Sequence, residues 1–387
     1  MRFSLLALAI AALLGIGACS AAAANPLDGR GMWIWEVPSS SGGNVDAMIS
    51  TAHRYGISTV YVKSSDGTSM WSQFNSSFVR ALHSAGVHVC AWQYVYGDHP
   101  VAEAQLGAAA VHDGADCLMI DAEVEYQGKY AQAQTYMSTL RSLVGYSYPL
   151  ALAGFPYVDY HPAFPYSVFL GRGAAQYNAP QMYWADIGVS VDTVFAHTYL
   201  FNRPYNRAIY PLGEVYDNPP PSQLKRFREV SKAYGAQGVS WWDWQESPLR
   251  AWRALSQPVG RIPAYAPAAG MASLGSGAQG DLVVWAQEHL RSAGYKSLAI
   301  DGSFGPKTRW TVSNFQLEEK LPVTGIIDST TWSVLLRWPP AYVRWAKPTK
   351  GVSADVASAG LTPPPKSASL PMKRDEIAGA GGRGHTH

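Results

Sequence analysis

Residues 87–123 read VHVCAWQYVYGDHPVAEAQLGAAAVHDGADCLMIDAE. Two short apolar runs, 87–94 and 117–123, flank a segment, 101–112, whose apolar residues recur at helical spacing. Gly, Asp and Pro mark the turns between these three parts. Strands that alternate with helices of about a dozen residues are typical of parallel sheets. This stretch therefore predicts one strand–helix–strand unit of an α/β fold.

The same alternation extends in both directions, from residue 28 to residue 256. The strand candidates are 31–37, 59–64, 87–94, 117–123, 150–155, 179–184, 208–212 and 238–242. The helical patterns between them are 45–55, 77–85, 101–112, 130–143, 191–201 and 222–234, whereas the Pro-broken segment after Asp159 predicts a poor helix. Eight such units predict an α/β fold of the (β/α)8 TIM-barrel type. A doubly wound open sheet is the alternative, and the count of eight favours the barrel.

The fourth predicted strand ends in two carboxylates, Asp121 and Glu123. Residues two apart in a strand share a face, so both side chains should point into the carboxyl-terminal end of the barrel, where such folds carry their active sites. Mutual repulsion should raise one pKa, as a general acid that protonates a glycosidic oxygen requires. A structural salt bridge, for example with Lys63, is the alternative to this catalytic role.

Further polar and aromatic residues follow the predicted strands and are candidates for substrate binding. They are Trp35, Glu36, Tyr94, Gln181, Tyr183, Trp184, Glu214, Trp242 and Asp243. Their aromatic rings could stack on sugars, although about half of them are expected to be ordinary packing. A second catalytic carboxylate, if one is used, could be Glu36, Glu214 or Asp243. The sequence has neither a Ser nucleophile elbow nor a His-Glu-x-x-His motif, so we expect no metal and no cofactor.

The Asp-x-Glu at Asp121 and Glu123 resembles two barrel families that cut amino-sugar polymers. One is the phage and bacterial muramidase family, and the other is the chitinase-like family. The chain departs from the chitinase pattern at Met119, and Trp184 stands where that family has Asp after its Met-x-Tyr segment. The resemblance implies a glycoside hydrolase of the muramidase or chitinase type.

A second module is predicted at residues 274–338. Its apolar residues lie at helical spacing around turns marked by Asp301-Gly302, Gly305 and Gly325. Together with Phe315-Gln316 and the segment from Leu321 to Trp332, this pattern resembles the peptidoglycan-binding module of bacterial wall hydrolases. The resemblance implies a small all-α three-helix module and peptidoglycan as a partner.

The two ends of the chain have the composition of export and tail segments. Arg2 and an apolar run predict a signal peptide over 1–24, ending either before a lipidated Cys19 or at Ala24. Residues 257–273 are rich in Pro, Ala and Gly and predict a linker, and 339–387 predict a disordered tail. Cys90 and Cys117 could pair, but two buried free thiols are favoured because neighbouring strand positions seldom give good disulfide geometry.

These features together predict an exported, monomeric wall-binding glycoside hydrolase that is secreted or held in the cell envelope. A net charge of +2 gives no indication of nucleic acid as a partner, and we expect contact with a membrane only through a possible lipid anchor at Cys19. Two other functions remain open. The barrel could be a degenerate, non-catalytic wall-binding scaffold, or it could hydrolyse another amino-sugar polymer.

Overall fold

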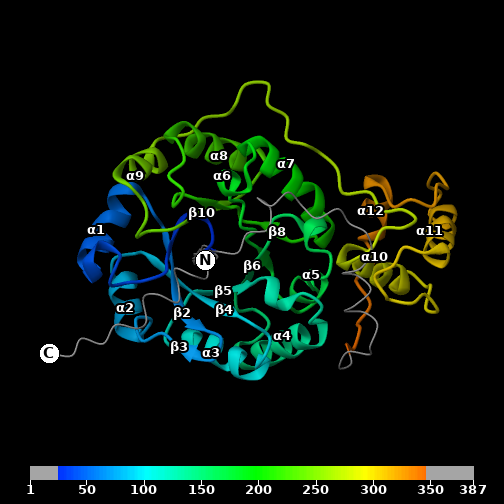
Figure 1. The fold of residues 1–387 in the computed structure, drawn as a ribbon, viewed down its shortest axis with the longest axis horizontal. Helices are drawn as coiled ribbons and strands as arrows, with labels where there is room; N and C mark the ends of the chain where they lie inside the picture. Colours follow the sequence, from blue (N-terminus) through cyan, green and yellow to red (C-terminus); the bar gives the residue numbers. More distant parts are fainter. Residues whose placement is uncertain (1–24, 346–387) are drawn as a thin grey trace, which may run out of the picture.

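The computed structural model describes residues 25–345, and the predicted signal peptide with Cys19 lies outside this range. Nine parallel strands form the barrel (Figure 1). They are β1 (Gly29–Ile34), β2 (Thr59–Asp66), β4 (His88–Val95), β5 (Cys117–Ala122), β6 (Leu150–Ala153), β7 (Tyr177–Asn178), β8 (Ala208–Ile209), β9 (Leu212–Glu214) and β10 (Gly238–Trp242). A short strand, β3 (Ser69–Met70), pairs antiparallel with β2.

The nine strands occupy eight positions because β8 and β9 are two parts of one strand interrupted at Tyr210 and Pro211. β8 pairs with β7, and β9 pairs with β10, which pairs with β1. A parallel bridge between Gln181 and Leu212 joins the β7 side to β9. The sheet therefore closes, which confirms the TIM-type barrel and excludes the open doubly wound sheet.

Helices surround the barrel in the predicted order. They are α1 (Val45–Tyr55), α2 (Ser76–Ser84), α3 (Pro100–His112), α4 (Tyr130–Val144), α5 (Tyr166–Phe169), α6 (Trp184–Ile187), α7 (Val191–Asn202), α8 (Pro221–Ala233) and α9 (Leu249–Ser256), with one-turn 3-10 segments at Ser41–Gly43, Val124–Tyr126, Val158–Tyr160 and Arg203–Tyr205. Asn44, Asn75 and Ser190 cap α1, α2 and α7 through their side-chain oxygens. The segment after Asp159 forms only short helical turns, as its prolines predicted. No helix within residues 25–345 has the length and apolar character needed to span a membrane.

The predicted strand 179–184 is wrong in its extent. Only Tyr177–Asn178 and the single bridge at Gln181 pair with neighbouring strands, and α6 begins at Trp184. Pro180 interrupts this region because a proline has no N–H to donate to a strand ladder.

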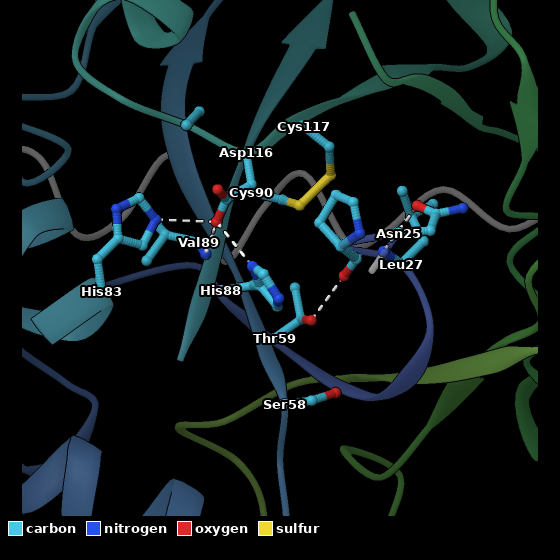
Figure 2. Close-up of polar contacts among 12 residues, drawn as sticks. Asn25, Leu27, Ser58, Thr59, His83, His88, Val89, Cys90, Asp116 and Cys117 are labelled. Carbon is cyan, nitrogen blue, oxygen red and sulfur yellow. Dashed lines mark hydrogen bonds and ion pairs between the residues drawn. A yellow bond between two sulfur atoms is a disulfide. The ribbon is translucent and has the colours of Figure 1, made fainter. Parts of the chain in front are cut away.

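Cys90 and Cys117 form a disulfide, so the expectation of two free thiols is wrong (Figure 2). They are register partners on β4 and β5, and both belong to the apolar cluster inside the barrel. Their Cα atoms lie 4.6 Å apart, within the range that a disulfide bridges. Beside them Asp116 accepts hydrogen bonds from the Val89 amide at 2.8 Å and from the ring of His83 at 2.9 Å. These contacts tie the starts of the two strands together.

The C-terminal module consists of α10 (Asp281–Ser292), α11 (Pro306–Glu318) and α12 (Ser329–Leu335). Two glutamine side chains hold its turns in the same way. The Gln287 side-chain oxygen accepts from the Asp301 and Gly302 amides, and that of Gln316 accepts from the Thr324 and Gly325 amides. Gly302 and Gly325 have φ of 72° and 68°, which glycine adopts without steric cost.

The module docks on the barrel beside α5 (Figure 1). Asp281, at the start of α10, is fully buried and accepts from the Ser167 amide and hydroxyl and from the Tyr205 hydroxyl, at 2.7–2.8 Å. The Trp285 indole donates to the Pro204 carbonyl at 2.7 Å. The contacts include a buried carboxylate with several donors, so the module is held in one orientation on the barrel.

The predicted disordered tail is wrong over 339–345, and residues 346–387 lie outside the described range. The Gln134 side chain on α4 donates to the Val343 carbonyl at 2.7 Å and accepts from the Trp345 amide at 3.0 Å. The ring of Trp345 lies 4.4 Å from that of Tyr130. Aromatic packing and these hydrogen bonds therefore bind the segment 339–345, which we call the strap, to the barrel. Between barrel and module, the predicted linker 257–273 contains neither helix nor strand.

Candidate active site

Asp121 and Glu123 lie together at the carboxyl-terminal end of β5. Asp121 is in register with Tyr94 on β4 and Ala153 on β6. Alternate residues before it, Cys117 and Met119, belong to the apolar cluster inside the barrel. Strand alternation therefore directs Asp121 inward, as predicted.

Gln181 links the two carboxyl groups. Its side-chain amide donates to the Asp121 Oδ1 at 3.0 Å and to the Glu123 Oε1 at 2.9 Å. The bridge between Gln181 and Leu212 fixes the backbone that carries this amide. Asp121 is 2% exposed and Glu123 is 6% exposed. The pair is thus a buried, hydrogen-bonded unit rather than two solvated carboxylates.

Burial determines the protonation of the pair. Desolvation raises the pKa of Glu123 to about 7, against the lowering effect of the Gln181 hydrogen bond. Desolvation and the neighbouring Glu123 raise the pKa of Asp121 well above its usual range. Because the two carboxyls hydrogen-bond to each other, they titrate as a unit. The pair therefore retains a proton near neutral pH, which general acid catalysis requires.

The salt-bridge alternative required Lys63 to form an ion pair with Asp121 or Glu123, and it does not. Its ammonium lies 2.7 Å from Asp66 and is almost fully buried. The rings of Trp71 and Trp92 lie 4.5 and 4.8 Å from the ammonium. The Lys63 charge still lowers the pKa of Asp121. Asp66 was not predicted, because the second strand was expected to end at residue 64 and extends to residue 66.

Glu125 is a third carboxylate at this end of the barrel and was not predicted. The Tyr94 hydroxyl donates to its Oε2 at 2.7 Å, and its charge raises the pKa of Glu123. Burial, followed by the charges of Glu123 and Asp121, raises the pKa of Tyr94. Glu125 follows Glu123 by two residues, a spacing that could have revealed it. Unlike the buried pair, it is partly exposed.

The predicted aromatic residues divide into packed and partly exposed rings. Trp242 is 6% exposed and packs against Trp92 at a centroid distance of 5.3 Å. Trp35 is partly exposed, and its indole N–H has no hydrogen-bond partner within residues 25–345. Tyr183 is packed as well, at 6% exposed, and its ring lies 5.7 Å from that of Tyr216. Trp35 and Tyr94, which are both partly exposed, are therefore the predicted rings best placed to meet a ligand.

Trp184 is not available to bind a sugar, so this prediction is wrong. Its side chain is fully buried in the layer between the barrel and α8, where its ring lies 4.9 Å from that of Phe227. The indole donates to Gln223 at 2.8 Å. The residue begins α6 rather than extending a strand, which turns it outward.

The three carboxylates proposed as second catalytic groups form hydrogen bonds away from Asp121 and Glu123. Glu214 accepts from the Ala185 and Asp186 amides at the start of α6, at 2.5 and 3.3 Å. Asp243 accepts from the Glu246 amide, and Glu36 accepts from the Ser39 hydroxyl at 2.8 Å. None of them contacts Asp121 or Glu123. Burial raises the pKa of Glu214 and of Asp243 to about 8.

Across residues 25–345, no set of three or more His, Cys, Asp or Glu side chains is grouped as a metal site. Asp121, Glu123 and Glu125 can supply proton transfer and charge stabilisation at this end of the barrel.

Comparison with known proteins identifies the C-terminal module. Residues 279–335 match the peptidoglycan binding domain family. The N-terminal domain of SleB is 33% identical over 17% of this chain and 90% of that chain, with a TM-score of 0.17. No curated protein sequence matches the chain.

Solved structures with low similarity to the barrel include a chitinase and a mannanase. A class V chitinase from Pseudomonas fluorescens Pf-5 is 10% identical over 59% of this chain and 98% of that chain, with a TM-score of 0.46. An endo-1,4-β-D-mannanase from Thermotoga petrophila RKU-1 is 8% identical over 56% of this chain and 88% of that chain, with a TM-score of 0.43.

Proposed function

We propose that the protein is an exported glycoside hydrolase that cleaves glycan bonds of peptidoglycan. The observation that carries the catalytic part is the buried Asp121–Glu123 pair, linked by Gln181 at the carboxyl-terminal end of the barrel. The match of 279–335 to the peptidoglycan binding family supports the substrate and a location at the cell wall. Either signal cleavage route, before Cys19 or after Ala24, would export a monomeric enzyme.

In this proposal Glu123 is the general acid. It donates its proton to the glycosidic oxygen as the C–O bond breaks, water then adds its hydroxyl to the sugar carbon, and the remaining proton of that water restores Glu123. Asp121 hydrogen-bonds to Glu123 and shares the Gln181 amide with it, so it lies beside the acid, whereas a nucleophile would stand apart from the acid across the scissile bond. We therefore assign Asp121 to orienting Glu123, and the partly exposed Glu125 to stabilising positive charge on the sugar.

The module is proposed to bind the wall through a groove on α11. The groove has a volume of about 510 Å³, and its lining includes Arg309 and Trp310. The Trp310 side chain is 64% exposed, so its ring is free to stack on a sugar. A module fixed to the barrel would keep the enzyme at high local concentration on an insoluble polymer.

The decisive experiment measures lysis of purified cell walls by turbidity and by released reducing sugar. Glu123→Gln should lower the rate by at least about 100-fold, because general acid catalysis contributes on the order of 10² to 10⁴. Wall binding by the same variant should remain intact. Asp46→Asn, which changes an exposed carboxylate on α1, is the matched control and should leave the rate unchanged.

The anchor is tested by fractionation. If Cys19 carries a lipid, Cys19→Ala should move the protein from the membrane fraction to the soluble fraction. A mature N-terminus at Asn25, found by mass spectrometry, would instead establish ordinary secretion.

One observation favours a second function, that of a non-catalytic wall-binding protein. Asp121 and Glu123 are only 2% and 6% exposed, so a sugar would reach them only after side chains at the barrel end move. Wild-type protein that binds walls but releases no reducing sugar from walls or chitin oligomers would establish this function. Release from chitin oligomers alone would indicate another amino-sugar polymer.

A further inference from the structure

A cavity lies where the barrel, the module and the strap meet. Its volume is about 230 Å³, and its lining comes from α4, the loop 171–174, α10 and the strap. These segments are distant in sequence, so the cavity exists only when the module and the strap are docked. Its size is below the roughly 300–1,000 Å³ of pockets that enclose drug-sized ligands, which favours a small end group over a sugar chain.

Glu288 on α10 brings an unpartnered carboxyl to this cavity. The residue is 5% exposed, and its side chain makes no hydrogen bond or ion pair with any residue of 25–345. Its neighbour Asp281 is satisfied by Ser167 and Tyr205. The Arg291 guanidinium is engaged by the Leu298 carbonyl. Buried polar groups are nearly always hydrogen-bonded, so an open carboxyl on a cavity wall points to a ligand that donates to it.

Arg172 supplies the opposite charge to the same cavity. It is exposed, and its guanidinium has no partner within the described chain. Arg141 also lines the cavity, but its guanidinium donates to the Ala174 and Tyr148 carbonyls at 2.7 Å. The cavity therefore presents one free carboxyl and one free guanidinium that do not pair with each other.

We propose that this cavity binds an α-amino-acid zwitterion, with the ammonium on Glu288 and the carboxylate on Arg172. A carboxylate and a guanidinium on the walls match the two charges of such a group and form charge-assisted hydrogen bonds with it. Two sources carry this chemistry. One is a free amino acid, and the other is the free side-chain end of a diamino acid in a wall stem peptide, a source that rests on the proposed function.

Burial and the nearby Asp281 raise the pKa of Glu288 well above its usual range. A bound ammonium would favour the ionised form of the carboxyl and so lower this raised pKa. Binding near neutral pH should then release a proton, and the measured heat should depend on the ionisation enthalpy of the buffer. A Glu288 that serves only to pack the interface would give no such proton release.

The test is calorimetric titration of the full-length protein with two probes, free meso-diaminopimelic acid and a disaccharide tripeptide that ends in this residue. Arg172→Gln and Glu288→Gln should each weaken binding at least about tenfold. The exposed Arg337→Gln, on a residue outside the cavity, is the matched control and should bind as wild type. Arg172 is exposed, so its substitution tests the proposal even if Glu288→Gln undocks the module.

The probes separate the sources. Binding of the free amino acid alone indicates a free amino-acid ligand, whereas binding of the tripeptide indicates the wall. Lack of saturable binding of either probe at millimolar concentration, or binding that neither variant weakens, overturns the proposal. Neither variant touches Asp121 or Glu123, so failure of the lysis assay and failure of this titration are separate results.

Discussion

Glu123→Gln should slow lysis at least about 100-fold and, at alkaline pH, stabilise the barrel. Burial raises the pKa of Glu123 from its ordinary value of 4.5 to about 7. A carboxyl with a raised pKa favours the folded state while it is protonated. That stability is fully present below the unfolded value of 4.5 and is lost as the pH rises through about 7. Gln cannot ionise, so the variant avoids this loss.

The size of the effect follows from the same difference. The change in pKa from 4.5 to about 7 corresponds to roughly 3 kcal/mol, at about 1.4 kcal/mol per pKa unit. Asp121 shares the proton and absorbs part of the change, so we expect a gain in the free energy of unfolding of about 1–3 kcal/mol at about pH 8. At about pH 4, where wild-type Glu123 is protonated in both states, the gain should vanish.

The assay is urea unfolding followed by tryptophan fluorescence, for wild type, Glu123→Gln and the exposed control Asp46→Asn. Only Glu123→Gln should show a gain in the free energy of unfolding that depends on pH. A variant whose unfolding free energy relative to wild type is the same at both pH values would refute the reasoning, because Glu123 would then not be held protonated by burial. Lysis by the wild type should fall as the pH rises above about 7, since the acid loses its proton there.

Three further predictions concern the Gln181 link, the disulfide and the C-terminal module. Gln181→Leu removes the hydrogen bond that lowers the pKa of Glu123. The alkaline limb of the pH–rate profile should therefore shift to higher pH, and the rate should fall. An alkaline limb at the wild-type pH would contradict the link between Gln181 and Glu123. Replacing Cys90 and Cys117 together by Ser opens a bridge that spans 27 residues, which should cost about 3–4 kcal/mol in urea unfolding. The same loss should follow reduction of the wild type, and equal stability of the two forms would count against the disulfide. Trp310→Ala should weaken sedimentation with purified walls about tenfold, while Leu317→Ala, an exposed residue two turns along α11 and outside the groove, should not.

Local patterns in the sequence predicted the elements and part of the site. The order of strands and helices, the polar ends of the strands and the place of Asp121 and Glu123 follow from periodicity over a few residues. The two-residue strand period alone directed Asp121 inward above Cys117 and Met119. Glu125 was overlooked although its spacing carried the same signal.

Contacts between distant segments could not be predicted in this way. The alignment of Cys90 with Cys117 depends on the register between β4 and β5, which spacing along the chain does not determine. Trp184 was expected at the sugar and lies against α8, because Pro180 shortened the preceding strand and a helix turned the side chain outward. The other candidate carboxylates accept hydrogen bonds from a hydroxyl or from backbone amides and do not join the carboxyl pair. They are Glu36, Glu214 and Asp243.

The sequence by itself determined the eight-unit alternation, the carboxyl pair and the C-terminal helical module, because each depends on residues close together in the chain. The tertiary structure alone decided the closure of the barrel through Leu212 and the link from Gln181 to both carboxyls. It also decided the docking of the module through Asp281. These features join segments that are far apart in sequence, and their geometry depends on how the whole chain packs.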